Sequence, residues 1–217
     1  MADIFDEVEE DLRAERAKRI LRRYGWAVLA LLLLVLAGLA GWQVWQGRRT
    51  QGAEAGAEAF LAATRETEAQ GADLRAAADR FATLAGTATE GYRILAGLRA
   101  AALKDETGQH EAALALYERL AGDADADPLY RELASLMWVV HSLDTGDPAA
   151  LEARLAPLTR ADGPWRASAQ EAAALVAIRR GDTASARRTL QALSGDVTAP
   201  AGVRDRAGKL LSGLEGG

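Results

Sequence analysis

The chain has 217 residues, no cysteine and a formal net charge of −5 at pH 7. The lack of cysteine excludes a disulfide framework and a cysteine-linked lipid. An acidic balance, without a basic patch that alternates with aromatic residues, argues against nucleic-acid binding.

Residues 1–23 are the first predicted element, a helical segment that precedes a long apolar run. Ile4, Phe5 and Val8 recur at helical steps and share one face. Two interpretations remain open for this segment. It is either a solvated helix that leads into a membrane anchor, or a docking helix on which these three side chains contact a partner protein.

Residues 24–47 contain no charged residue and are mostly aliphatic. About 20 apolar helical residues cross a membrane core about 30 Å thick, so this segment predicts a single transmembrane helix. Aromatic residues stand at both of its ends, as expected for side chains at the two headgroup levels. These predicted membrane-interface anchors are Tyr24, Trp26, Trp42 and Trp45.

The charges around this segment predict its direction. Six Lys and Arg residues lie between positions 13 and 23, whereas two, Arg48 and Arg49, follow the apolar segment directly. Basic residues mark the cytoplasmic side, so residues 1–23 are predicted to be cytoplasmic and residues 48–217 to lie across the membrane. Gly38-Leu39-Ala40 resembles a signal-peptide cleavage site, but the long, late apolar run favours an uncleaved anchor.

Small residues at a spacing of four within the anchor suggest a contact between helices. Ala37 and Gly41 form such a pair, and pairs of this kind allow two membrane helices to approach closely. They are common in alanine-rich spans. A weak homodimer is therefore a further hypothesis for the anchor.

Residues 48–217 have the composition of a helical domain. Alanine, leucine, arginine and glutamate dominate, and β-branched residues are sparse. Apolar stripes at three- and four-residue steps alternate with breaks that contain Gly, Asp and Pro, which predicts short antiparallel helices with tight connections. One such stripe consists of Leu129, Leu133, Leu136, Met137 and Val140.

A repeat underlies these helices. A glycine is followed by apolar residues five, nine and twelve positions later, and the spacing occurs three times. The copies are Gly108, Ala113, Tyr117 and Leu120; Gly181, Ala186, Leu190 and Leu193; and a looser set of Gly146, Leu151, Leu155 and Leu158. The glycines recur near the 34-residue period of tetratricopeptide repeats. The sequence therefore predicts an all-α protein, with an N-terminal transmembrane helix and a tetratricopeptide-like α-solenoid of antiparallel helix pairs. A non-repeat helical bundle is the alternative.

Several motifs together resemble a known family. They are the acidic-then-basic segment MADIFDEVEEDLRAERAKRILRRYG, the single anchor, GWQVW from Gly41 to Trp45, YRILA from Tyr92, GQHEAALALYERL from Gly108, GPWR from Gly163, RRGD from Arg179, and Pro200 followed by Arg204, Arg206 and Ala207. In these motifs the chain resembles the membrane-anchored, tetratricopeptide-repeat-like ancillary subunit of the bacterial SecYEG translocon, the YfgM family. The resemblance covers nearly the whole chain, although the chain is richer in Ala and Arg and its first repeat is degenerate.

The resemblance implies a location and partners. It implies an anchor in the bacterial inner membrane, a periplasmic repeat domain, and association with the Sec translocon, with periplasmic chaperones and with exported polypeptides. The matching motifs are packing motifs, and that family has no catalytic residues to carry over.

Residue types that carry chemistry are few. The two histidines are His110 and His141, and His141 has no second ligand three or four residues away, so a boundary histidine is favoured over a metal ligand. No HExxH motif, phosphate-binding glycine loop or serine elbow occurs. We predict a non-enzyme without catalytic residues, metal or cofactor. An enzyme with an unrecognised acidic site would need desolvated, positioned carboxylates.

Two tryptophans, Trp138 and Trp165, have two interpretations. Large aromatic residues usually fill the core, so both are favoured as fillers between repeats. Alternatively, one lines a concave groove that binds an extended apolar segment. The sequence thus predicts a membrane-tethered protein-binding scaffold at the translocon. The alternative is a structural envelope or cell-division scaffold with one fixed partner and no client binding.

Overall fold

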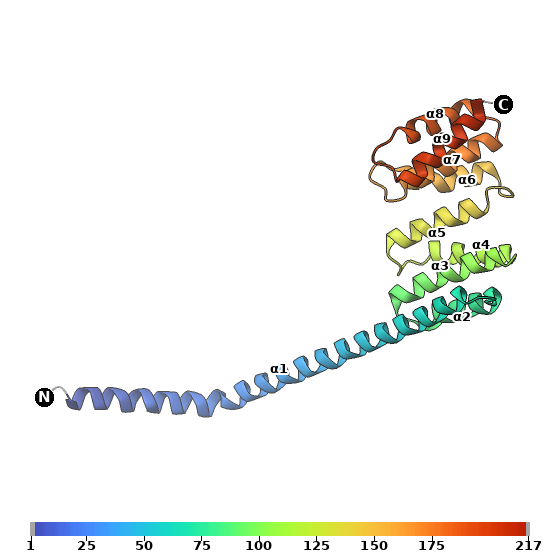
Figure 1. The fold of residues 1–217 in the computed structure, drawn as a ribbon. Helices are drawn as coiled ribbons and strands as arrows, with labels where there is room; N and C mark the ends of the chain where they lie inside the picture. The colour runs from blue at the N-terminus through green and yellow to red at the C-terminus, as the bar shows by residue number, and fades with distance from the viewer. Residues whose placement is uncertain (1–2, 216–217) are drawn as a thin grey trace. The chain divides into compact units, whose positions relative to one another are not determined.

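The computed structural model describes residues 3–215; side chains 3–25, 27–29, 44, 48–50, 90 and 215 lie outside that description. The described residues form helices and turns without a strand (Figure 1). The helices are α1 (Asp3–Glu68), α2 (Leu74–Thr87), α3 (Glu90–Glu106), α4 (His110–Ala121), α5 (Pro128–His141), α6 (Pro148–Leu155), the 3-10 helix η1 (Ala156–Thr159), α7 (Arg166–Arg179), α8 (Thr183–Ser194) and α9 (Ala201–Glu215). Two compact units divide the chain, Met1–Gly52 and Ala53–Gly217.

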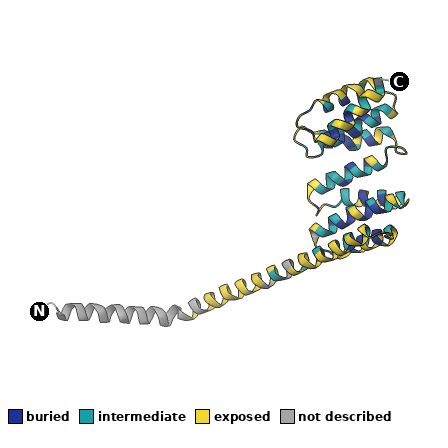
Figure 2. Cartoon of the chain, in the orientation of Figure 1, coloured by how far each residue is buried: buried dark blue, intermediate teal, exposed yellow. Residues whose placement is uncertain are grey.

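The first unit is helical through its described residues and exposes large apolar side chains. Trp26 is 74% exposed, and the run Leu31–Leu36 is exposed throughout (Figure 2). Within the described part of α1, Ala30–Glu68 contains an apolar window long enough to cross a membrane, and none of that window is buried. By length and composition this part of α1 is suited to cross a membrane, as the sequence predicts for residues 24–47.

The second unit is a stack of antiparallel helices in which each helix packs chiefly against its neighbours in sequence (Figure 1). Its core consists of successive buried clusters, as expected when each repeat contacts only the next. The largest side chains are Phe81, Leu103 and Tyr117 in the first cluster, Leu136, Leu151 and Leu155 in the second, and Leu190, Leu193 and Val203 in the third.

The stack contains a repeat of two helix pairs, 73 residues long. Gly108 and Gly181 have φ of 77° and 79°, a left-handed conformation that glycine adopts without cost. After Gly108, the N–H of Gln109 donates to the Lys104 carbonyl at 2.7 Å, and the equivalent bond after Gly181 is 2.9 Å. Such bonds satisfy the free carbonyls at a helix end, so both turns close the preceding helix in the same way.

Ion pairs follow the same 73-residue spacing. Arg93 Nη1 binds Asp123 Oδ2 at 2.8 Å, and Arg166 Nη2 binds Asp196 Oδ2 at 2.6 Å. In both loops the aspartate also accepts a bond from the backbone N–H two residues later. The hydrogen bonds from Thr198 and Arg166 hold the pKa of Asp196 well below its usual range. Each ion pair joins the helix that carries the arginine, α3 or α7, to the loop that follows the next helix, α4 or α8.

Gly146 differs from the other two repeat glycines. It occupies the same repeat position as Gly108 and Gly181, but its φ is not positive. Its N–H donates to the Ser142 carbonyl at 2.8 Å, and a Cβ at this position would lie 2.9 Å from that oxygen. Glycine is required here by the close approach of the chain. Gly71, with φ 78°, provides a third left-handed turn that the sequence reading missed.

The buried face of α5 also differs from the predicted stripe. Leu129 and Val140, at its two ends, are 40% and 39% exposed. The buried residues of α5 are Ala134, Leu136 and Val139, of which only Leu136 belongs to the predicted stripe. The prediction was wrong at both ends because α5 packs between α4 on one side and α6 and α7 on the other. Its buried surface is therefore not a single straight stripe.

Candidate functional site

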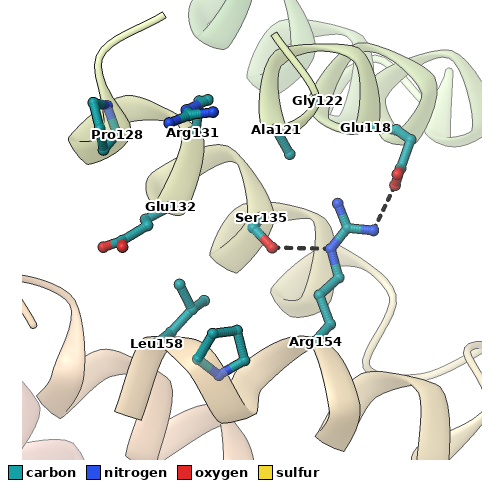
Figure 3. Close-up of a pocket in the computed structure, with 10 residues that line it drawn as sticks. Glu118, Ala121, Gly122, Pro128, Arg131, Glu132, Ser135, Arg154 and Leu158 are labelled. Carbon is teal, nitrogen blue, oxygen red and sulfur yellow. Dashed lines mark hydrogen bonds and ion pairs between the residues drawn. The ribbon is translucent and has the colours of Figure 1, made fainter. Parts of the chain in front are cut away.

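A groove lies between α4, α5 and the segment formed by α6 and η1 (Figure 3). Its volume is about 410 Å³ and it opens to solvent. The residues that line it are Glu118, Ala121, Gly122, Pro128, Arg131, Glu132, Ser135, Arg154, Pro157 and Leu158. Most of the lining is apolar, with charged groups at defined positions.

The start of α5 determines which side chains enter the groove. Asp127 Oδ1 accepts a bond from the N–H of Leu129 at 2.8 Å, which caps the helix and sets its first residue at Pro128. Residues three and four positions apart share a helix face. The spacing therefore places Pro128, Arg131, Glu132 and Ser135 along one wall.

Arg154 of α6 connects the walls of the groove. Its Nε donates to Ser135 Oγ at 3.0 Å, and its Nη1 binds Glu118 Oε2 at 2.5 Å (Figure 3). The guanidinium carbon also lies 4.4 Å from the centre of the Trp138 ring, an arrangement typical of a cation–π contact. One arginine from α6 thus holds both α4 and α5.

A second arginine in the groove has no such partners. Nε of Arg131 is buried and donates to no acceptor within the described residues. The nearby carboxylate of Glu132 is engaged by Arg160 Nη2 at 2.9 Å. Within the groove, Arg131 is therefore a cation without a matched carboxylate.

Of the two predicted tryptophans, Trp138 lies within α5 and Trp165 contacts the start of that helix; both are half-buried. Trp138 lies beneath Arg154, against the first and second core clusters. Trp165 Nε1 donates to the Leu129 carbonyl at 2.9 Å, which joins α7 to the start of α5. The structure thus brings the two side chains to one helix, where each makes a packing contact.

The other predicted residues lie in the first unit. The side chains of Ile4, Phe5, Val8 and Tyr24 lie outside the described residues. Trp42 and Trp45 are 62% and 48% exposed, and their ring centres are 5.2 Å apart. The proposed contact face of residues 4–8 stays a prediction, as do the interface anchors.

A second polar cluster surrounds Asp105 and uses both histidines. Nδ1 of His110 lies 2.6 Å from Asp105 Oδ1, and Nδ1 of His141 lies 2.9 Å from Oδ2. The Tyr117 ring stacks on His141 with 5.3 Å between centres, and its hydroxyl lies 3.5 Å from His141 Nε2. One carboxylate therefore joins α3, α4 and α5.

Titration of this cluster follows from its contacts. Burial opposes ionisation of Asp105, but the hydrogen bond from His110 and the charge of His141 outweigh it and lower its pKa. Burial, with the charge of Asp105, raises the pKa of Tyr117 to about 12. In the part of the chain that the structure describes, no group of three acidic or histidine side chains is arranged to hold a metal ion.

The sequence reading did not select Arg131, Arg154 or Asp105. These residues lie in different helices from most of their contacts, so their roles depend on tertiary contacts that no local motif records. The sequence shows two histidines, but nothing in their spacing indicated that both contact one carboxylate.

Comparison with known families decides the class of the fold. A family model for a tetratricopeptide repeat-like domain matches residues 18–199. The chain belongs to this tetratricopeptide repeat-like family. The predicted helical repeat is thereby confirmed over the bundle alternative. Tetratricopeptide repeat-like domains are protein-binding scaffolds and generally not catalytic, which fits a groove between repeats. No curated protein and no solved structure matches the chain.

Proposed function

We propose that the chain is a membrane-tethered scaffold of the YfgM type, which binds exported polypeptides at the Sec translocon and recruits periplasmic chaperones. The observation that carries the proposal is an apolar window within α1 that is long enough to cross a membrane and is not buried. An unburied apolar surface of this length fits a lipid environment.

Charge supports the proposed direction. The basic residues before the apolar segment favour a cytoplasmic amino end, so the repeat domain is proposed to lie in the periplasm. The tether keeps the domain close to emerging chains and raises its effective concentration, so weak contacts suffice. The same tether is lost if the chain is cut after Gly38-Leu39-Ala40.

The groove beside α5 is the proposed client site. Trp138 within this helix packs under Arg154, and Trp165 bonds to the start of the helix, so both contacts help to hold α5 in place. Leu129 is 40% exposed at its start, directly after the groove residue Pro128. An extended apolar segment is proposed to contact Leu129 and the adjoining groove wall.

A photo-crosslinking amino acid in living cells tests this proposal. It is placed at Leu129, because replacing a half-buried tryptophan would disturb the repeat packing. A second variant carries it at Phe5, and Val197, 88% exposed in the loop between α8 and α9, is the matched control.

The proposal expects many different exported chains at Leu129, one fixed membrane partner at Phe5, and far fewer products at Val197. A single stable partner at Leu129, with no exported chains, would support the structural envelope or division scaffold instead. If Leu129 and Val197 gave the same amount and kind of crosslinked products, the groove would not be the client site.

A further inference from the structure

The groove contains a hydrogen-bond donor that the chain does not satisfy. Nε of Arg131 is buried and has no acceptor among the described residues, although Arg131 lines an open cavity. Nearly all buried donors in folded proteins are paired, so a guanidinium that the chain leaves unpaired beside a groove indicates a position for an acceptor from another molecule. Because Nε itself is closed to solvent, a ligand in the groove would meet the terminal nitrogens of this half-buried side chain.

The carboxylates of the groove are engaged by other arginines. Glu118 binds Arg154 at 2.5 Å, and Glu132 binds Arg160 at 2.9 Å. The charge of Arg131 is therefore not offset by the groove itself. A guanidinium presents its donors in a planar fork that matches a carboxylate, so the complementary group is an anion of that shape.

The second copy of the repeat shows that an arginine here can be satisfied internally. Arg204 lies 73 residues after Arg131, the same period that separates Gly108 from Gly181. Nη1 of Arg204 donates to the Ala199 carbonyl in its own loop. The architecture thus allows an arginine at this position to bind its own backbone, and Arg131 makes no such bond.

The other charged and polar lining residues, Glu118, Glu132, Ser135 and Arg154, are paired with one another or with Arg160, and the remaining lining of this small groove is apolar. Ala121, Pro128, Pro157 and Leu158 form walls around a volume of about 410 Å³. Binding sites for small groups span about 300–1,000 Å³, so this one accommodates an acidic side chain with an apolar neighbour. A lone inorganic anion would leave the apolar walls uncovered.

We infer that the groove binds an internal Asp or Glu side chain of an extended polypeptide, next to an apolar residue, with Arg131 as the anion-binding group. The inference rests on the proposed protein-binding function and names the chemistry of its ligand. The carboxylate accepts from Arg131, and the apolar neighbour lies on the proline and leucine side chains.

Fluorescence anisotropy on the full-length protein in detergent micelles tests the inference. The probe is a labelled, C-terminally amidated Ser-Leu-Glu-Leu-Ser peptide. Its Gln analogue lacks the charge, and a Ser-Leu-Gln-Leu peptide with a free C-terminus carries only a terminal carboxylate. We expect the Glu peptide to bind about tenfold more tightly than the Gln peptide, and Arg131→Gln to abolish that difference.

Controls separate binding from folding. Arg131→Lys should restore part of the preference, because it keeps the charge but loses the fork. Arg204→Gln should leave the preference unchanged. Arg131→Gln should keep the unfolding midpoint, since Nε has no partner to lose. Equal affinity for the Glu and Gln peptides, or a preference for the free C-terminus alone, overturns the inference. If the unmodified protein crosslinks exported chains at Leu129 but binds the Glu and Gln peptides equally, the inference is overturned and the proposed function stays intact.

Discussion

Asp105 joins the chain's two histidines to one carboxylate, at the boundary between two helix pairs. The other copy of the 73-residue repeat has Ile178, Thr183 and Leu214 where this copy has Asp105, His110 and His141. The polar cluster is therefore specific to this copy of the repeat.

Replacing Asp105 with Asn should make stability less sensitive to acid. The lowered pKa of Asp105 means that its ionised form stabilises the folded state above its usual pKa, and that this contribution is lost as pH falls through the lowered value. We expect Asp105→Asn to cost about 1–3 kcal/mol near pH 6, since bonds to a charged group are removed. The cost should shrink near pH 3.

Urea unfolding at both pH values, followed by tryptophan fluorescence, measures this difference. Asp125→Asn, at an exposed side chain in the loop before α5, is the matched control and should change neither midpoint. A cost that is the same at both pH values would show that Asp105 acts through packing alone.

At the scale of helices, the turns divide into two kinds. Gly108 and Gly181 end their helices with a left-handed residue, and Gly71 forms a left-handed turn shortly after α1. Gly146 instead stands where the chain passes close to Ser142. In the turn between α5 and α6, the Ser142 carbonyl therefore leaves no room for a side chain at position 146. The turn lies beside α6, which has only 8 residues before it continues as η1.

Gly146→Ala should destabilise the repeat domain. The new Cβ would lie 2.9 Å from the Ser142 carbonyl oxygen and 3.2 Å from Leu151 Cδ2, so backbone as well as side chain must move. We expect a cost of about 1–3 kcal/mol, typical of overpacking. Gly208→Ala, within α9 and with nothing within 4 Å of its Cβ, should instead stabilise by about 0.5–1 kcal/mol.

Urea midpoints of the two variants, compared with the unmodified chain, test this contrast. A neutral Gly146→Ala would mean that the α5–α6 turn relaxes at no cost.

For the whole molecule, the central expectation is a direction across the membrane. The chain contains no cysteine, so single-cysteine variants report position without background. In cells with a permeabilised outer membrane, a membrane-impermeant maleimide should label Val197→Cys and should leave Ala2→Cys unlabelled until the inner membrane is disrupted. Mass measured from a C-terminal tag shows whether the labelled chain is uncleaved. Labelling of Ala2→Cys alone while the inner membrane is intact would reverse the proposed direction.

The sequence by itself determined the helical class, the repeat and the apolar segment. These properties depend on local composition and spacing: glycine and aspartate breaks, alanine-rich stripes, and a run without charge. Asp127, Asp147 and Asp182 cap helices at the breaks where they were expected. Such signals are legible because a capping bond or a left-handed glycine involves residues a few positions apart.

Only the tertiary structure decided which side chains gather in the groove and which are exposed. Arg154 reaches Glu118 across 36 positions and Ser135 across 19, and Leu129 and Val140 are exposed because α5 packs between three other helices. The unpaired Arg131 became visible only when the partners of its neighbours were known. Contacts between repeats depend on how helices stack, and that arrangement is set by the summed packing of many side chains rather than by any one motif.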